Sequence, residues 1–355
     1  MELDDLRQLK SIDKSDMLGL LTEFPKQCAK AKEIGEAFSI KRDYIAGCNK
    51  ILFTGLGGSA IGADLIRTYL ADEAKLPIFV NRNYTLPNFV SGDTLVVASS
   101  YSGNTEETIS AYADAKRRGA RLIAITSGGQ LADMARADNI PLLAIPGGLP
   151  PRAALGYSFF PSLALLSKIG IASDKSGEID SAIRLMDELG EDKIGPKAAA
   201  KDNLAKTLAR RLYGKFPIIY GGQDHIDSVV IRWRGQLAEN SKTLASSHVF
   251  PEMNHNEIVG WENPKKVFGD LIVLCLRDSL DHPRTKKRMD ITRRIIEKDG
   301  VEYIEVESIG RSLLERIFSL IYIGDFVSFY LAALNNVDPT PVDRVTYLKK
   351  ELAKG

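Results

Sequence analysis

The chain has 355 residues, a formal net charge of +1 and a hydrophobic fraction of 44%. That length suffices for two domains of ordinary size. A charge so near zero excludes a broad basic surface for nucleic acid or for a membrane. We expect no apolar run long enough to cross a bilayer and no signal peptide. The three cysteines lie far apart and show no disulfide or metal spacing. We therefore expect a cytoplasmic protein.

The first half of the chain begins with a helical segment at 1–45 and continues as a strand–helix repeat at 46–170. Short apolar runs there alternate with helical patterns, which predicts a parallel sheet covered on both faces. The runs expected to be strands lie at 51–53, 77–80, 94–98, 121–125 and 142–145.

The second half repeats this outline after a charged helical connector at 171–215. Apolar runs at 216–220, 270–275 and 303–306 predict strands of a second domain at 216–335, and a turn and helix follow at 336–355. We expect an α/β protein with two doubly wound domains, each with a parallel five-stranded sheet, related by a divergent internal duplication. The copy lacks the hydroxyl-rich turn of the first half, so it is expected to supply other parts of the site.

Two turns of the first domain predict a phosphate pocket. Gly57-Gly58-Ser59 follows the first strand, and Ser100-Tyr101-Ser102-Gly103-Asn104-Thr105 follows the third. Each turn leads into a helix, whose free backbone N–H groups and positive dipole end favour an anion at the carboxyl edge of the sheet. Asn104 and Glu107 have the spacing of a capping box for the second helix. The residues expected to contact phosphate are Gly58, Ser59, Ser100, Ser102 and Thr105.

The glycine turn also fits a dinucleotide-binding fingerprint, since Gly55, Gly57 and Ala60 have the required spacing. That fingerprint places an acidic residue at the end of the second strand, where this chain has Asn81-Arg82-Asn83. Arg82 would suit a 2′-phosphate, so this interpretation stays open. The second hydroxyl-rich turn has no role in it, which favours a sugar-phosphate pocket.

These two turns, together with Thr126-Ser127-Gly128-Gly129, resemble a sugar isomerase (SIS) domain. The resemblance implies a flavodoxin-like fold that binds phosphosugars. Three further segments, at 148–154, 236–242 and 251–257, narrow it to the bifunctional phosphoglucose/phosphomannose isomerase family, from about residue 40 to the C-terminus. The family implies interconversion of glucose 6-phosphate and mannose 6-phosphate with fructose 6-phosphate, through ring opening and a cis-enediol(ate). The resemblance also implies a hexose 6-phosphate substrate and a homodimer.

Four residues match catalytic positions of that family. Glu239 ends an amphipathic helix and is expected to be the base, because a carboxylate can carry one proton between adjacent carbons. Arg152 is expected to balance the charge of the enediolate. The resemblance makes His255 the ring opener, delivered across the dimer interface, and places Lys349 near the sugar ring. Lys350 is the neighbour that could hold that role instead.

The four histidines have no metal-ligand spacing. We therefore predict an enzyme without metal or cofactor. The alternative is a non-catalytic SIS regulator that binds phosphosugars, which would keep the hydroxyl turns but need no base.

Overall fold

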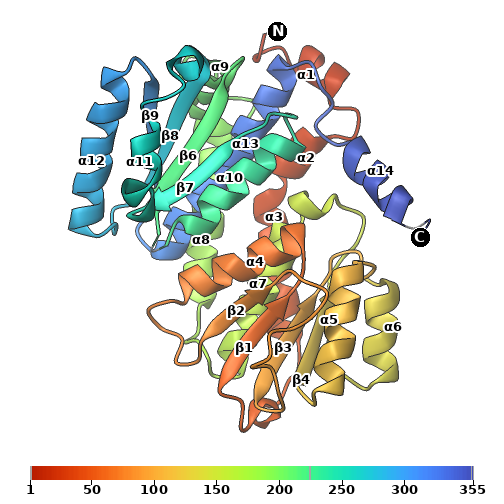
Figure 1. Ribbon diagram of the computed structural model, residues 1–355. Coiled ribbons are helices and arrows are strands. Elements are labelled where there is room, and N and C mark those ends of the chain that lie inside the picture. Colours follow the sequence, from red (N-terminus) through yellow and green to blue (C-terminus); the bar gives the residue numbers. More distant parts are fainter. Residues whose placement is uncertain (1, 224, 353, 355) are drawn as a thin grey trace. The chain divides into compact units, whose positions relative to one another are not determined.

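The computed structural model describes residues 2–223, 225–352 and 354 (Figure 1). It divides into two compact units. The five-stranded unit consists of Glu23–Leu185 and Gly310–Glu315, and the four-stranded unit of Met1–Thr22, Met186–Ile309 and Arg316–Gly355. The segments expected at 1–45 and 171–215 are therefore each divided between the two units.

The five-stranded unit contains a wholly parallel sheet in the order β2-β1-β3-β4-β5. Every residue of β3 is buried, as are the last four of β1 and the last five of β4, which explains their uninterrupted apolar sequences. The strands are β1 (Lys50–Thr54), β2 (Ile78–Asn81), β3 (Thr94–Ser99), β4 (Arg121–Thr126) and β5 (Leu142–Ala144). Because β1, β3 and β4 are neighbours, the loops that follow them leave the same edge of the sheet.

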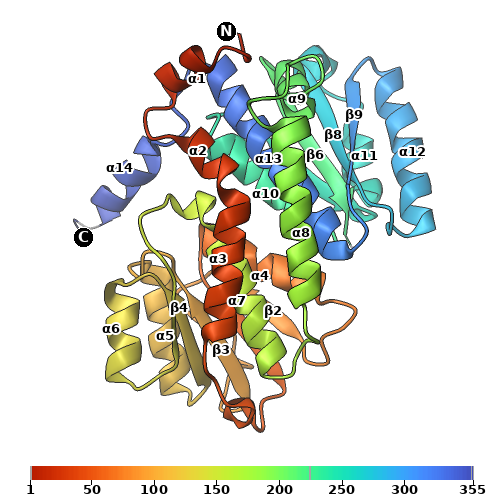
Figure 2. The same cartoon turned by 180° about the vertical axis from the view of Figure 1, so that it is seen from behind.

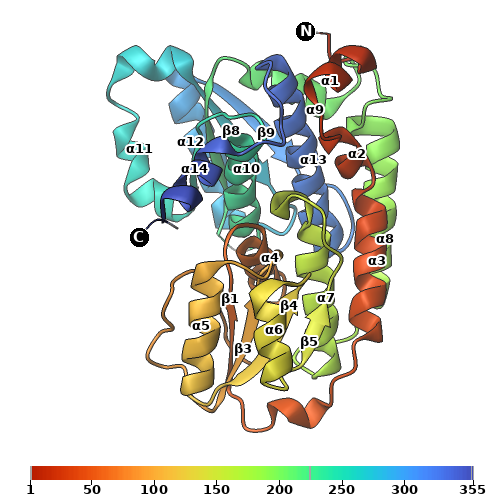
Figure 3. The same ribbon diagram turned by 90° about the vertical axis from the view of Figure 1, so that its right-hand side faces the viewer.

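Helices cover both faces of this sheet (Figures 2 and 3). On one face, α5 and α6 share a core with β1, β3 and β4, in which Tyr112 and Leu131 are fully buried. On the other, α7 packs against both α3 and α4. The helices are α3 (Phe24–Ala37), α4 (Gly57–Tyr69), α5 (Glu106–Arg117), α6 (Gly129–Ala137) and α7 (Leu155–Lys168).

The four-stranded unit also has a parallel sheet, in the order β7-β6-β8-β9. Its strands are β6 (Phe216–Gly222), β7 (Ser246–Phe250), β8 (Leu271–Arg277) and β9 (Glu302–Glu307). The expectation of a fifth strand is wrong, because β9 ends at Glu307 and the next helix begins at Leu313. That interval has no room for the helix and strand that follow β4 in the other sheet. The sequence patterns also missed β7, an edge strand in which only Phe250 is buried.

The helices of this unit include α10 (Asp227–Glu239), which packs on β6 and β7, and α12 (Pro283–Lys298), which packs on β9. The others are α1 (Leu6–Ile12), α2 (Met17–Thr22), α9 (Leu204–Leu212), α11 (Glu257–Gly260) and α14 (Asp343–Leu352). The unit boundary falls within α8 (Ser176–Leu189) and α13 (Leu313–Leu334).

The long apolar helix α13 corrects the expectation that the chain has no apolar run long enough to cross a bilayer. By length and composition alone it is apolar enough to cross a membrane, although 94% of its most apolar window is buried inside the protein. Trp233 of α10 packs on this helix and donates a hydrogen bond of 2.8 Å from its indole N–H to the carbonyl of Leu320. These contacts are those of a core helix.

Candidate active site

The turn between β1 and α4 presents backbone donors beside Ser59. The N-cap residue is Leu56, and no side chain caps this end of the 13-residue helix. The N–H of Ser59 donates to the carbonyl of Leu56 at 3.1 Å. The donors that this turn can offer to an anion are therefore the N–H groups of Gly57 and Gly58, at the positive end of the helix dipole. Gly55 fixes this turn against β3, since a Cβ there would lie 2.7 Å from the carbonyl oxygen of Ser99. Ser59 is 7% exposed.

Hydroxyl groups organise the loop between β3 and α5. The side-chain oxygens of Ser100 and Thr105 lie 2.9 Å apart. The Ser100 hydroxyl also accepts from the N–H of Gly103 at 3.1 Å, and the Ser102 hydroxyl accepts from the N–H of Asn104 at 3.3 Å. The loop thus holds three hydroxyl groups at the N-terminus of α5, with Thr105 as N-cap residue.

The loop between β4 and α6 packs tightly against this hydroxyl loop. Gly103 has a φ of +73°, and a Cβ there would lie 1.7 Å from the carbonyl oxygen of Gly128. The expected capping box is wrong, because Asn104 is not the N-cap residue of α5. Its side-chain oxygen instead accepts from the N–H of Gln130 at 3.0 Å, so Asn104 ties the hydroxyl loop to the start of α6.

Arg152 lies in the short 3-10 turn η2 (Pro151–Ala153), which precedes α7 in the same unit. Its residue is 6% exposed. The turn touches the start of α4, since a Cβ on Gly58 would lie 2.5 Å from the carbonyl oxygen of Pro151. The five-stranded unit therefore brings Arg152 next to the glycine turn of the predicted phosphate pocket.

Sequence reasoning missed Gln27, which holds the turn that carries Arg152. The side-chain amide of Gln27 in α3 donates to the carbonyl of Ala153 at 2.8 Å and accepts from the N–H of Gly156 at 3.0 Å. Gly156 is in the first turn of α7, where N–H groups have no partner within the helix. No sequence pattern links Gln27 to residues so far along the chain.

Charged residues near these loops have partners of their own. Glu107 and Glu106, in the first turn of α5, raise the pKa of the exposed Tyr84 hydroxyl by their charge and by hydrogen bonding. Arg82 forms an ion pair with Asp64 of α4. An arginine engaged in this way does not support the 2′-phosphate role that the dinucleotide interpretation requires.

The four-stranded unit carries Glu239, His255 and Lys349. Glu239 is the last residue of α10 and is half-buried. His255 ends the 3-10 turn η4 (Glu252–His255) and is exposed; its neighbour Asn254 anchors that turn by donating to the Thr292 hydroxyl at 2.9 Å. Lys349 and Lys350 both lie in the last turn of α14 and are both exposed, so burial does not separate them.

A row of buried polar contacts sets the rotation of α10 against α13. Arg232 forms an ion pair of 2.6 Å with Asp325, and Gln236 donates to the same carboxylate at 2.9 Å. One turn further on, Asn240 donates to the Ser328 hydroxyl at 2.9 Å. Residues four apart lie on one helix face, so this row fixes the orientation of the helix end at Glu239.

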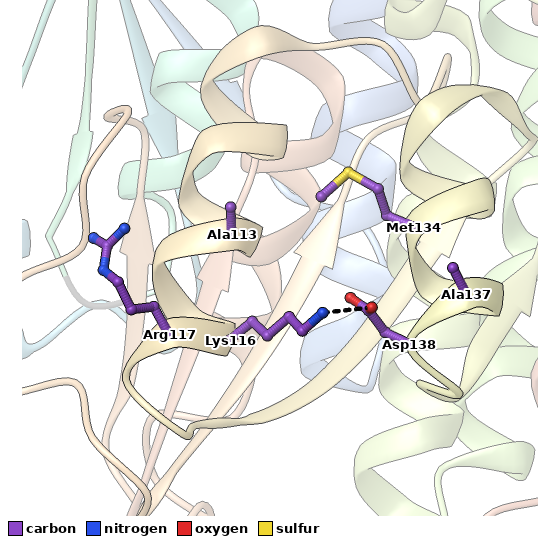
Figure 4. A pocket seen from close by; sticks show the side chains of 6 residues that line it. All are labelled: Ala113, Lys116, Arg117, Met134, Ala137 and Asp138. Atoms are coloured by element: carbon purple, nitrogen blue, oxygen red, sulfur yellow. Dashed lines mark hydrogen bonds and ion pairs between the residues drawn. The ribbon is translucent and has the colours of Figure 1, made fainter.

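A pocket of about 490 Å³ lies away from the hydroxyl loops (Figure 4). It is lined by Ala113, Lys116, Arg117, Met134, Ala137 and Asp138. These residues belong to the C-terminal parts of α5 and α6, whereas the hydroxyl loops precede their N-termini. Within the described ranges, no group of three or more His, Cys, Asp or Glu side chains is placed to hold a metal ion.

Comparisons with known proteins bear on both units. Residues 44–145 match the SIS domain family, and residues 201–352 match the family described as bacterial phospho-glucose isomerase C-terminal SIS domain. The bifunctional phosphoglucose/phosphomannose isomerase of Caldicellulosiruptor bescii is 48% identical over 93% of this chain and 97% of its own length. The protein of the same name from Aquifex aeolicus is 38% identical over 86% of this chain and 90% of its own length.

A solved structure confirms the fold class. The crystal structure of a hypothetical protein from Thermus thermophilus superposes with a TM-score of 0.74, covering 98% of this chain and 93% of that one. Its sequence is 16% identical, so this likeness concerns the fold alone. The SIS match includes the glycine turn, and the dinucleotide-binding interpretation is not supported.

Proposed function

Because the chain belongs to the bifunctional phosphoglucose/phosphomannose isomerase family, we propose that it interconverts glucose 6-phosphate and mannose 6-phosphate with fructose 6-phosphate. The observation that carries this proposal is that two hydroxyl-bearing turns follow neighbouring parallel strands, β1 and β3, where Gly55 packs against Ser99. Each turn leads into a helix without a side-chain cap. Such a place suits the phosphate of a sugar. In the proposal the contacts come from Gly58, Ser59, Ser100, Ser102 and Thr105.

The proposed reaction begins with opening of the sugar ring. His255 passes a proton between the ring oxygen and the C1 hydroxyl, a task that suits an imidazole near neutral pH. The exposed position of His255 is compatible with its delivery to the site of a second copy, so we propose a homodimer with shared sites. Lys349 contacts the sugar near the ring.

Proton transfer between C1 and C2 follows in the open chain. The carboxylate of Glu239 removes the C2 proton of the aldose. The electrons of that C–H bond form the C1–C2 double bond of a cis-enediol(ate), and the electrons of the C1–O1 π bond move onto O1, which takes up a proton. Glu239 then returns its proton to C1 while the O2 hydroxyl loses its proton and the C2 carbonyl forms, giving the ketose. The guanidinium of Arg152 balances the negative charge that develops on the oxygen of the enediolate. Rotation about C2–C3 before reprotonation at C2 gives either the glucose or the mannose epimer.

A coupled assay with fructose 6-phosphate tests the proposal directly. Formation of glucose 6-phosphate is followed through NADP reduction by added glucose-6-phosphate dehydrogenase, with and without added chelator to test the predicted metal independence. Turnover supports an isomerase. Binding of the sugar phosphate without turnover would instead support the alternative, a non-catalytic SIS regulator.

A further inference from the structure

We propose that Tyr101 is a positioning residue, which fixes Arg152 relative to the loops that bind the substrate phosphate. The proposal rests on the function proposed above and adds a residue to that site. Tyr101 lies within the hydroxyl loop but contributes no hydroxyl to the predicted phosphate contacts. Its residue is only 9% exposed.

The contacts of Tyr101 join three loops of the five-stranded unit. Its phenol oxygen accepts a hydrogen bond of 3.1 Å from the backbone N–H of Leu149, in the loop after β5. Its backbone carbonyl accepts from both the N–H and the hydroxyl of Ser127, at 3.1 and 2.6 Å, in the loop after β4. Tyr101 itself follows β3. One residue thus links loops from three successive strands of the sheet.

The bond to Leu149 reaches Arg152 through two prolines. Pro150 and Pro151 separate the two residues and have no backbone N–H, so Leu149 supplies the last backbone donor before Arg152. Proline also restricts φ of its own residue and the backbone of the residue before it. The segment is therefore a stiff spacer, and holding Leu149 in place limits where Arg152 can lie.

The far side of the same turn is held independently. Gln27 bonds to Ala153 and Gly156, as described above, and this contact does not involve the hydroxyl loop. Arg152 therefore lies between the Tyr101 bond on one side and the Gln27 contacts on the other. Tyr101 links this segment to the hydroxyl loop, and Pro151 contacts Gly58 of the glycine turn. Loss of the Tyr101 bond is expected to loosen the loop before Arg152 while α7 stays in place.

The protonation state of Tyr101 agrees with a role in positioning. Burial raises the pKa of its hydroxyl, an effect larger than the lowering by the Leu149 N–H. The phenol therefore stays neutral at physiological pH.

Tyr101→Phe removes only the phenol oxygen. We expect kcat to fall about two- to tenfold, the range that corresponds to loss of one hydrogen bond. Inhibition by inorganic phosphate, which tests the phosphate contacts alone, should be unchanged. The carboxylate of 5-phosphoarabinonate resembles the enediolate. The inhibition constant of this compound should rise by the same factor by which kcat/KM falls.

Tyr44→Phe is the matched control. The Tyr44 hydroxyl donates 2.7 Å to the carbonyl of Leu122, near the start of β4 and hence at the opposite edge of the sheet. This variant also loses one partly buried bond between a tyrosine hydroxyl and the backbone of the same unit, with the hydroxyl as donor instead of acceptor. Both inhibition constants should stay at their wild-type values.

A double-mutant cycle with Arg152→Ala shows whether Tyr101 acts through Arg152. Tyr101→Phe should weaken 5-phosphoarabinonate binding in the wild-type background and have no further effect in the Arg152→Ala background. An equal effect in both backgrounds, or a Tyr101→Phe variant indistinguishable from Tyr44→Phe, would overturn the role of Tyr101. A wild-type protein without turnover would instead count against the proposed function.

Discussion

The ammonium group of Lys242 donates a hydrogen bond of 2.6 Å to the backbone carbonyl of Glu239, the last residue of α10. The same group also donates to the carbonyl of Pro339 at 3.1 Å. A cation at this position satisfies carbonyl groups that the helix leaves open and interacts favourably with the negative end of its dipole. Lys242 thereby ties the proposed base to the turn that precedes α14, the helix of Lys349.

Removing the Lys242 ammonium is expected to affect both stability and turnover. Lys242→Met keeps most of the aliphatic stem, so the free energy of unfolding should fall by only about 1 kcal/mol. We also expect kcat to fall, because the end of α10 at Glu239 loses its hydrogen bond to Lys242. Lys201→Met is the control, since that side chain is 84% exposed and lies 4.0 Å from its nearest acidic partner. Equal kcat values for both variants would contradict the prediction.

Glu239→Gln replaces the proposed base by an uncharged side chain of the same shape. Turnover of fructose 6-phosphate should drop by about 10²- to 10⁴-fold, the usual contribution of a general base. The inhibition constant of inorganic phosphate should stay at the wild-type value, because the proposed phosphate contacts belong to other residues. A variant that keeps wild-type kcat would exclude Glu239 as the base.

Gly103 and Gly119 form a matched pair for the packing of the hydroxyl loop. Their φ values are +73° and +70°, so alanine at either position meets similar backbone strain, about 1–2 kcal/mol. A Cβ on Gly119 meets nothing within 4 Å, whereas one on Gly103 collides with the Gly128 carbonyl. Gly103→Ala should therefore lower the melting temperature much more than Gly119→Ala and weaken phosphate inhibition. Similar melting temperatures would show that the two loops separate readily.

Acid sensitivity of the five-stranded unit should depend on Asp114. This residue is 4% exposed, and its carboxylate accepts from the N–H of Leu86 at 3.0 Å and pairs with Arg117 and Arg118. Burial opposes the charge, but the Leu86 N–H and the two arginines together hold the pKa of Asp114 below its usual range. The folded state therefore binds this proton less readily than the unfolded state does. The resulting stability is present above about pH 4 and is lost as the pH falls through the folded-state value.

Thermal unfolding between pH 3 and 7 measures this contribution. The wild type should be more stable than Asp114→Asn at neutral pH, and the difference should shrink on acidification. Asp133→Asn serves as control because its side chain is 79% exposed, and it should follow the wild-type curve. A pH-independent gap between wild type and Asp114→Asn would mean that the residue acts through packing alone.

The sequence predicts the elements that depend on local pattern. Buried strands such as β3 appear in the sequence as unbroken apolar runs. The hydroxyl turns can be recognised from their residue types and from their position directly after a strand. The edge strand β7 lacks such a run and was missed. The capping-box prediction for Asn104 is also wrong, because that pattern depends only on the local sequence at the start of α5. The side-chain oxygen of Asn104 instead accepts a hydrogen bond from the N–H of Gln130.

Contacts between distant parts of the chain are what the sequence could not reveal. Gln27 bonds to Ala153 and Gly156, and Tyr101 to Leu149, although nothing in their local sequences marks them as partners. The buried ion pair of Arg232 and Asp325 also cannot be predicted from the sequence. Arginine and aspartate in a helix are each typical of a solvent-exposed face. Such supports depend on tertiary packing and need a structure to be recognised.

The interleaved order of segments has a practical consequence for dissecting this protein. Residues 1–22 belong with 186–309 and 316–355, and the other unit consists of 23–185 and 310–315. Cutting the gene midway would deprive the C-terminal product of the first two helices. An excised fragment spanning Glu23–Leu185 would keep its whole sheet, and it is the natural starting point for fragment complementation.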